Sequence, residues 1–258
     1  LTKERLKPKR AEKFSFHQFA DLVHNKAWLY MTAIAVCTNF FNGFRYAVAG
    51  YMFDYCLHGN VTIEGLIINY TVFMAFGEVT CMIFGGVSPW FTRMVGSKRM
   101  AFFWAATLCL ILSLAFFFIP MDPAYIWVMI ALVVLTSVGI GIYSPLLWSM
   151  YADCTDYSEL KTGNRATGLI FSSSSMSQKF GWAIGSALTG WLLSYFGFVA
   201  NEVQQAEAIQ GIKMFMSFLP AAGTLLSIVF ISMYPLSEKK MLEISAALKS
   251  RRAETEAD

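Results

Sequence analysis

Several polar side chains lie inside long apolar stretches of this sequence, and Lys179 is the most unusual of them. An ammonium group within a membrane-spanning helix is energetically costly, so it calls for a counter-charge or a functional reason. Ser172, Ser175 and Ser186 recur at helical spacing with Lys179 and would share one polar face with it. We expect this face to contact a hydrophilic solute, and Lys179 to compete with a coupling cation for nearby carboxylates.

Two other apolar stretches carry polar groups at helical spacing. Asn39, Asn42 and Tyr46 would share one face of the first helix, with Arg45 adjacent to it, and Glu78 lies within the second helix. Amide, hydroxyl and aromatic groups that meet in this way would line a polar cavity. The three helices therefore predict a pathway for a polar solute.

Structural interpretations of these charges remain open. Glu78 and Lys179 could simply pair with each other, since two buried charges are tolerated when they are paired. Arg45 could form a structural pair, or extend to the outer membrane interface from its position late in the helix. The serine run could be packing, with hydroxyls bonded back to the helix.

The elements that must position these residues are predicted to be transmembrane helices. The chain has 258 residues, of which 56% are hydrophobic and 14% charged, and this composition is typical of a polytopic membrane protein. Six apolar stretches are long enough to span a bilayer. They cover residues 27–53, 66–90, 100–119, 124–150, 166–196 and 212–234. We therefore predict an all-α membrane protein with six transmembrane helices.

Glycines and a proline suggest how two of these helices are built. Gly181 and Gly185 continue a stripe of small residues that would let another helix pack closely against the fifth stretch. Gly139, Gly141 and Pro145 interrupt the fourth stretch, and broken helices in membranes often line cavities. Tyr143 and Trp148 flank Pro145 and are candidate cavity residues.

The distribution of basic residues predicts the topology and three regions. Residues 1–26 form a basic cytoplasmic linker with an interfacial helix from 15 to 25, residues 27–235 form the bundle, and residues 236–258 form a cytoplasmic tail with a short helix. Most of the 20 lysines and arginines lie in the N-terminal segment, in alternate loops and in the tail. This pattern predicts that both termini are cytoplasmic and that the net charge of +3 reports topology, with no nucleic-acid partner. Since the chain begins with a basic segment and no cleavable signal, we expect a fragment of a longer chain whose missing part is N-terminal.

The chain contains a run that resembles a known family. DCTDYSELKTGNRATGLIFS (residues 153–172), followed by QKFGWAIGSALTGWLLSYFGF (178–198), resembles the glycoside–pentoside–hexuronide:cation symporters. These sugar carriers are related to the melibiose permeases within the major facilitator superfamily. Arg45, the segment 51–55 and the glycine- and base-containing loop 86–99 are also similar to the family pattern.

The resemblance implies that this chain is the C-terminal six-helix half of a twelve-helix carrier. It implies a central sugar site, an adjacent cation site with Na⁺ or H⁺ as the coupling ion, no other cofactor, and the missing N-terminal half as partner. Lys179 matches a family position that contributes a lysine to this site, and Ser175 falls where melibiose permeases carry a hydroxyl residue. The family's sugar-binding tryptophan aligns near Ser144 and a glutamine aligns at Ser174, so galactoside specificity does not carry over.

The charged segment after the fourth stretch is a candidate cytoplasmic gate. Opposite charges beside Gly163 could form ion pairs that hold the two halves together when the carrier faces outward. The alternative is a solvated loop whose exposed pairs contribute little. The candidate gate residues are Asp153, Asp156, Tyr157, Glu159, Lys161 and Arg165.

The sequence therefore predicts a multi-pass inner-membrane sugar:cation symporter. Its candidate substrate-binding residues are Asn39, Asn42, Arg45, Tyr46, Tyr143, Trp148 and Ser175, and its candidate coupling residues are Lys179, Glu78 and Ser175. We expect no metal site. We also do not expect an enzyme, because the serines lack a GxSxG motif and no histidine lies in a span. The alternatives are a carrier of another substrate, such as a lysolipid, and a stand-alone six-helix module.

Overall fold

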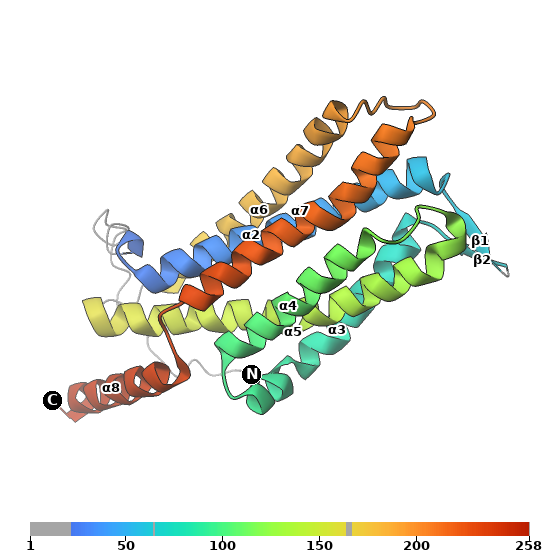
Figure 1. Ribbon diagram of the computed structural model, residues 1–258. Helices are drawn as coiled ribbons and strands as arrows, with labels where there is room; N and C mark the ends of the chain where they lie inside the picture. The colour runs from blue at the N-terminus through green and yellow to red at the C-terminus, as the bar shows by residue number, and fades with distance from the viewer. Residues whose placement is uncertain (1–21, 64, 164–166, 258) are drawn as a thin grey trace, which may run out of the picture.

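A computed structural model describes residues 22–63, 65–163 and 167–257, and Figure 1 shows that long helices dominate it. The predicted interfacial helix at residues 15–25 falls mostly outside the described residues. The elements are α2 (Lys26–Tyr51), a short π-helix (Met52–Cys56), β1 (Val61–Ile63), β2 (Leu66–Ile68), α3 (Tyr70–Val95), α4 (Lys98–Phe116), a 3₁₀ turn (Pro123–Tyr125), α5 (Ile126–Thr162), α6 (Thr167–Tyr195), α7 (Ala206–Met233) and α8 (Glu238–Ala257). Each of the six predicted apolar stretches overlaps one of the helices α2 to α7.

The helix ends follow from local residue chemistry. The side chains of Asn25 and Asn69 accept hydrogen bonds from the backbone N–H groups of Trp28 and Val72, which caps the first turns of α2 and α3. At the other end, α5 ends at Gly163, whose φ of 73° is the left-handed conformation that favours glycine. Helix α5 therefore continues through the charged residues 153–162 before it ends.

Four helices among the described residues are long and apolar enough to cross a membrane. They are α3, α4, α7 and the stretch Pro123–Thr162 that contains α5. The other two long helices, α2 and α6, have 26 and 29 residues, so their length is sufficient. Their asparagine, serine, lysine and arginine side chains lower their hydropathy. The chain is thus a mostly helical, multi-pass membrane-type protein, and α2 and α6 carry most of the candidate substrate-binding and coupling residues.

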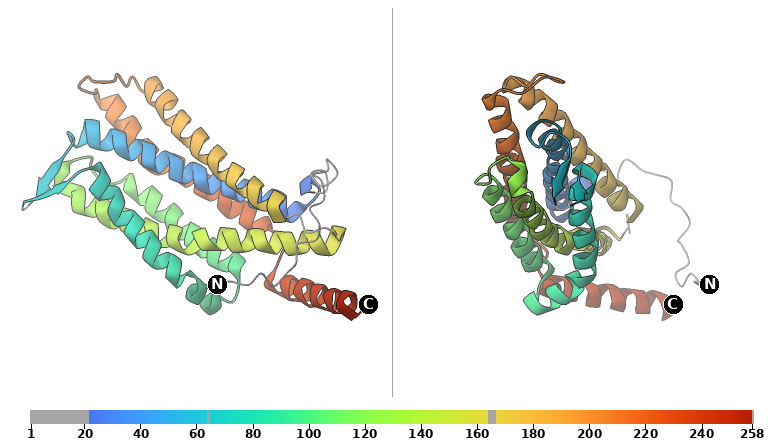
Figure 2. Two further views of the ribbon diagram at one scale, coloured as in Figure 1. Left: turned by 180° about the vertical axis from the view of Figure 1, so that it is seen from behind. Right: turned by 90° about the vertical axis from the view of Figure 1, so that its right-hand side faces the viewer.

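The long helices form an elongated bundle with a defined order of neighbours (Figure 2). Helix α2 packs against α6 and α7, α3 packs against α5, and α4 packs against both α5 and α7. Helices α3 and α6 do not pack against each other. The bundle therefore consists of one group around α2 and another around α5, joined through α4 and α7.

Helices α2 and α6 approach each other through glycine. A Cβ atom added at Gly181 would lie 2.5 Å from the carbonyl oxygen of Val36, and one added at Gly185 would lie 2.8 Å from that of Phe40. Ser174 and Ser177 are buried on the same side of α6. The predicted small-residue stripe for close helix packing is confirmed.

The prediction that glycines and proline interrupt the fourth stretch is wrong. Helix α5 runs without a break for 37 residues through Gly139, Gly141 and Pro145. A Cβ atom at Gly139 would lie 2.5 Å from Cys109 Sγ, and one at Gly141 would lie 2.6 Å from the carbonyl oxygen of Cys81. These glycines allow α4 and α3 to approach α5 closely.

The structure also contains a sheet that an all-α prediction omits. The three-residue strands β1 and β2 pair in antiparallel register, with Val61 opposite Ile68, in the connection between α2 and α3. Val61 and Ile68 are buried against the end of the bundle. The hairpin therefore closes one end of the apolar core.

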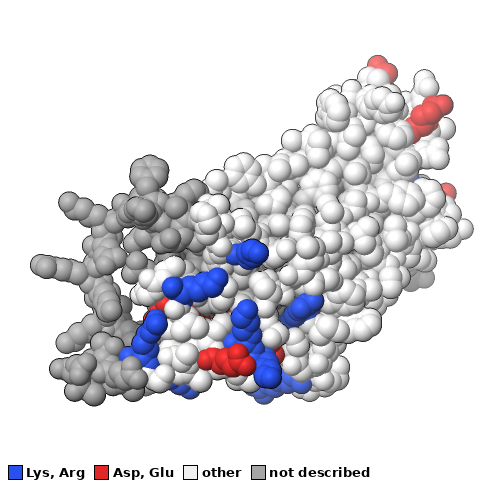
Figure 3. Space-filling model, turned by 60° about the vertical axis from the view of Figure 1, so that its left-hand side comes forward, with Lys and Arg blue, Asp and Glu red and all other residues white. Residues whose placement is uncertain are grey.

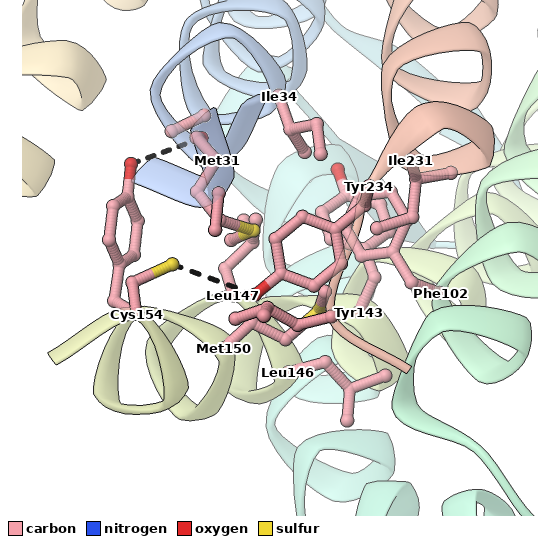
Figure 4. Packing of buried hydrophobic residues seen from close by; sticks show 14 of the residues in the cluster. Met31, Ile34, Phe102, Tyr143, Leu146, Leu147, Met150, Cys154, Ile231 and Tyr234 are labelled. Atoms are coloured by element: carbon pink, nitrogen blue, oxygen red, sulfur yellow. Dashed lines mark hydrogen bonds between the residues drawn. The ribbon is translucent and has the colours of Figure 1, made fainter. Parts of the chain in front are cut away.

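A buried cluster at the opposite end joins α2, α4, α5, α6 and α7 with the segment after α7, and Figure 4 shows part of it. The hydroxyl of Tyr151 donates a hydrogen bond to the carbonyl oxygen of Met31 at 3.1 Å, and Cys154 Sγ lies 3.5 Å from the Tyr234 hydroxyl. The apolar side chains around these contacts include Ile34, Phe102, Leu146, Leu147, Met150 and Ile231.

Helix α8 confirms that the C-terminal tail contains a helix. Ile244 and Leu248 are buried in the same cluster, and Met241 packs against it. Most of the other α8 residues up to Arg251 are exposed, and α8 contacts α5. The tail is thus docked onto the charged end of α5.

We expect Gly181→Ala to destabilise the protein, because the added methyl group would collide with the α2 backbone. Overpacking of this kind typically costs about 1–3 kcal/mol. The measurement is thermal unfolding of the purified protein in detergent. The control is Gly190→Ala on the same helix, where an added Cβ meets nothing within 4 Å. An equal loss of stability in both variants would contradict close packing at Gly181.

Candidate functional site

An open hollow of about 610 Å³ lies along α6 and faces one residue of α5. The α6 residues recur at intervals of three and four, so they form one stripe of the helix. The lining residues are Trp148, Ser175, Gln178, Lys179, Trp182, Ala183 and Ser186. The structure therefore brings together Ser175, Lys179, Ser186 and Trp148, which the sequence had singled out. Ser172 is exposed on the same helix but does not line the hollow.

Lys179 is exposed and forms no ion pair with any residue that the structure describes. Glu78 is exposed on α3, and the interpretation that Glu78 and Lys179 pair with each other is wrong, because no ion pair joins them and α3 does not pack against α6. An exposed charge midway along an apolar helix is unfavourable against lipid. The face that carries Lys179 is therefore suited to a polar neighbour rather than to lipid chains.

Trp182 is a site residue that was not predicted from the sequence. Its Nε1–H donates a hydrogen bond to Asn39 Oδ1 at 3.1 Å, and its ring lies 5.2 Å from that of Tyr46. Asn39 also donates from Nδ2 to the carbonyl oxygen of Ala35 at 2.8 Å. Trp182 and Gln178 lie seven and three residues after Ser175, so the helical spacing that identified Lys179 could have identified them too.

Trp148 provides a second exposed indole in the hollow. The side chain is 41% exposed, and its ring is stacked on Phe171 of α6 with 6.1 Å between centroids and 9° between planes. This contact holds Trp148 against the helix that carries Ser175 and Lys179. The hollow is thus lined by two indoles together with an amide, two hydroxyls and an ammonium group.

Arg45 and Tyr143 lie inside the bundle and do not line the hollow. Arg45 is only 6% exposed, so the interpretation that it extends to the outer interface is wrong. Its Nη1 lies 3.5 Å from Ser137 Oγ, its guanidinium lies 5.6 Å from the Tyr46 ring, and it borders a small cavity of about 20 Å³. The Nε of Arg45 and the hydroxyl of Tyr143 are buried without a hydrogen-bond partner.

The remaining candidates on α2 lie between these two regions. Asn42 and Tyr46 are partly buried, and Asn42 lies near Tyr143. Tyr46 contacts both Trp182 and Arg45, so it links the hollow to the buried arginine. Asn39 and Tyr46 on the predicted polar face of α2 therefore affect the hollow indirectly, because both contact Trp182, which lines it.

The five candidate gate residues from Asp153 to Lys161 lie on α5, so the interpretation of this charged segment as a loop is wrong. Asp153 receives two hydrogen bonds from Lys98 Nζ, at 2.8 and 2.7 Å, and this ion pair joins α5 to the first turn of α4. Lys161 and Lys240 lie over the ring of Tyr157 at 4.8 and 5.7 Å. Asp156 and Glu159 also have interaction partners, and Arg165 lies outside the described residues. The pair that the structure shows for Asp153 is thus within this chain, not with a second half.

Basic residues gather toward one end of the molecule. Figure 3 shows them there together with some acidic side chains, and an almost uncharged band separates this end from the acidic side chains visible at the other end. At the basic end, Arg99 donates to the carbonyl oxygens of Ser232 and Tyr234 and so ties α4 to the end of α7. Across the ranges 22–63, 65–163 and 167–257, no group of three or more His, Cys, Asp or Glu residues could hold a metal ion.

A double-mutant cycle should detect the ion pair between Lys98 and Asp153. We expect the effects of Lys98→Gln and Asp153→Asn on the free energy of unfolding to be non-additive by up to about 1 kcal/mol, because each substitution removes the same partly exposed ion pair. A control cycle of Lys98→Gln with Glu202→Gln, in the α6–α7 connection, should be additive. Additivity in both cycles would show that the pair contributes nothing.

Thiol labelling should distinguish the hollow from the packed side of α6. In a variant without native cysteines, Ser175→Cys should react rapidly with a membrane-impermeant maleimide, because Ser175 is exposed in the hollow. Ser174→Cys should react slowly, because Ser174 is fully buried. Equal reactivity at both positions would contradict the orientation of α6.

Comparisons with known proteins identify the family of this chain. Residues 2–238 match the family described as MFS/sugar transport protein. The glucuronide carrier protein homolog of Escherichia coli (strain K12) is 38% identical over 48% of this chain and 27% of its own length. The isoprimeverose transporter of Lactiplantibacillus pentosus is 42% identical over 46% of this chain and 25% of its own length.

A third relative aligns along most of the chain. The provisionally named glycoside/cation symporter YagG of Escherichia coli (strain K12) is 30% identical over 90% of this chain and 48% of its own length. The chain thus spans about half the length of this curated relative. Because the family match covers nearly the entire bundle, this chain belongs to the MFS/sugar transport protein family.

Proposed function

We propose that this chain is the C-terminal, six-helix half of a symporter that carries a glycoside, pentoside or hexuronide together with Na⁺ or H⁺. The observation that carries this proposal is the hollow on α6, where two exposed indoles, Ser175 and an unpaired Lys179 lie together. Aromatic faces and hydroxyl groups suit a sugar, which has apolar C–H surfaces and many hydrogen-bonding groups. The names of the three relatives support the same class of substrate.

The packing of α2 and α6 supports the six-helix arrangement. With 26 and 29 residues, both are at least as long as α3 and α4, and both lie within the same bundle. Their polar residues need not face lipid if those faces line an aqueous path. The basic residues gathered at one end of the molecule favour a cytoplasmic location for that end, and with it for both termini.

The other half of the carrier would complete the site. Lys179 lacks a carboxylate partner within the described part of this chain, so carboxylates from the N-terminal half would supply its counter-charge. A coupling cation that binds these carboxylates would displace Lys179 from them. Cation occupancy would then change the charge facing the sugar, which links the two solutes during alternating access. Glu78 is exposed on another helix of this half and could contribute a further carboxylate.

The charged end of α5 would act as the cytoplasmic gate. The Lys98–Asp153 pair fixes α5 to α4 within this half. Asp156, Glu159, Lys161 and Arg165 are the candidates for contact with the other half as the two bundles rock. The gate would open by separation of contacts between halves, while the pair at Asp153 stays intact.

A sugar fits the hollow better than the alternative of a lysolipid. An acyl chain would need a long apolar cleft, whereas this hollow includes Lys179, Gln178 and two serines. The stand-alone module is disfavoured because it would leave Lys179 exposed along a membrane helix. The complete carrier would reside in the inner membrane.

Lys179→Leu in the complete carrier should abolish cation-driven accumulation of sugar, because the positive charge that responds to the cation is lost. Uptake of a labelled sugar would be measured with sodium and pH gradients imposed separately. The matched control is Lys213→Leu on α7, where the ammonium lies over the Phe117 ring at 5.3 Å and outside the hollow. Normal coupled accumulation in Lys179→Leu would rule out the coupling role.

A further inference from the structure

Trp182 is held in place from two sides by residues of α2. Its Nε1–H is fixed by Asn39 Oδ1 at 3.1 Å, and its ring packs on Tyr46 at an angle of 49°. The backbone beneath it is also fixed, because a Cβ atom at Gly43 would lie 2.9 Å from the Trp182 carbonyl oxygen. The indole is nevertheless 38% exposed and lines the hollow. Trp182 is therefore a preorganised aromatic surface.

Both ends of the Asn39 amide already form hydrogen bonds within the protein. Its Oδ1 accepts from Trp182, and its Nδ2 donates to the carbonyl oxygen of Ala35. Asn39 is partly buried and is not among the residues that line the hollow. Both ends of the amide thus serve the protein, and the residue acts on the hollow through the indole.

The neighbours of Trp182 match what a sugar ring presents. Lys179 and Ser186 lie three and four residues away on the same helix, so their side chains flank the indole. A pyranose ring has C–H groups on its faces and hydroxyl groups around its edge. Stacking of one face on Trp182 would bury the C–H groups and direct hydroxyls toward Lys179 Nζ and Ser186 Oγ.

We propose that the sugar ring stacks on Trp182, and that Asn39 and Tyr46 are positioning residues that hold this indole and do not bind the sugar. This inference rests on the proposed function and adds a substrate-contacting residue to it. It also explains why the polar face of α2 adjoins a hollow whose lining comes mostly from α6.

The test compares transport KM among variants of the complete carrier, since KM does not depend on the amount of protein in the membrane. Trp182→Ala should raise KM for a pyranoside by about tenfold, with a smaller change in maximal rate, because the stacking surface is lost. Trp182→Phe should raise KM by less, because a ring remains but its hydrogen bond to Asn39 is gone. Trp191→Ala is the control, since this α6 indole is 72% exposed and lies outside the hollow.

The decisive measurement is a cycle between Asn39→Ala and Trp182→Phe. If Asn39 acts through the indole, each single variant raises the KM for the sugar. The double variant then has the same KM as Trp182→Phe, because both substitutions remove the same hydrogen bond. Additive increases would show that Asn39 binds the sugar directly, which would overturn the positioning role. This cycle does not use Trp182→Ala, so it remains a valid test even when that variant fails to reach the membrane.

Failure of the inference and failure of the proposed function give different results. If the wild-type carrier transports a sugar and neither Trp182 variant changes KM, the role of Trp182 is wrong and the proposed function stands. If the wild-type carrier transports no sugar from a panel of glycosides, pentosides and hexuronides, both are wrong.

Discussion

The close contact between α2 and α6 is the constraint on which the candidate site depends. Gly181 and Gly185 let the two backbones approach until there is no space for a methyl group between them. This contact places the side chain of Trp182 within hydrogen-bonding distance of Asn39. It also turns the opposite stripe of α6, with Ser175 and Lys179, away from α2 and into the hollow. Packing on one side of the helix thereby determines which groups meet a solute on the other.

Polar residues in this bundle serve two different purposes. Ser174 and Ser177 are buried where helices meet, whereas Ser175 and Lys179 are exposed in the hollow. Arg45 belongs to neither group. It is buried beside Ser137 with its Nε unbonded, and it forms no ion pair with a carboxylate among residues 22–63, 65–163 and 167–257. Its contacts with Ser137 and the Tyr46 ring offset part of the cost of burying the guanidinium group.

The extension of α5 organises the end of the bundle that we propose to be cytoplasmic. The helix continues past its apolar portion to Thr162, so its last turns project beyond the apolar part of the bundle. Lys98 anchors this extension through Asp153, and α8 docks onto it with Ile244 and Leu248. The extension is therefore rigidly joined to its own half. A rigid extension of this kind suits a carrier in which two bundles move against each other as units.

The sequence by itself determined the class of the protein, because apolar length, helical spacing and the charged motif are local properties. It also predicted the small-residue stripe of α6 and the grouping of Ser175, Lys179 and Trp148. It could not show that Gly139 and Gly141 are packing positions. From the sequence alone, a glycine that interrupts a helix cannot be distinguished from a glycine that lets a neighbouring helix pack closely. The tertiary structure alone decided that Glu78 and Lys179 are apart, that Arg45 is buried and that Asn39 holds Trp182. Each of these depends on which helices are neighbours, and the pattern within a single helix carries no information about the helix beside it.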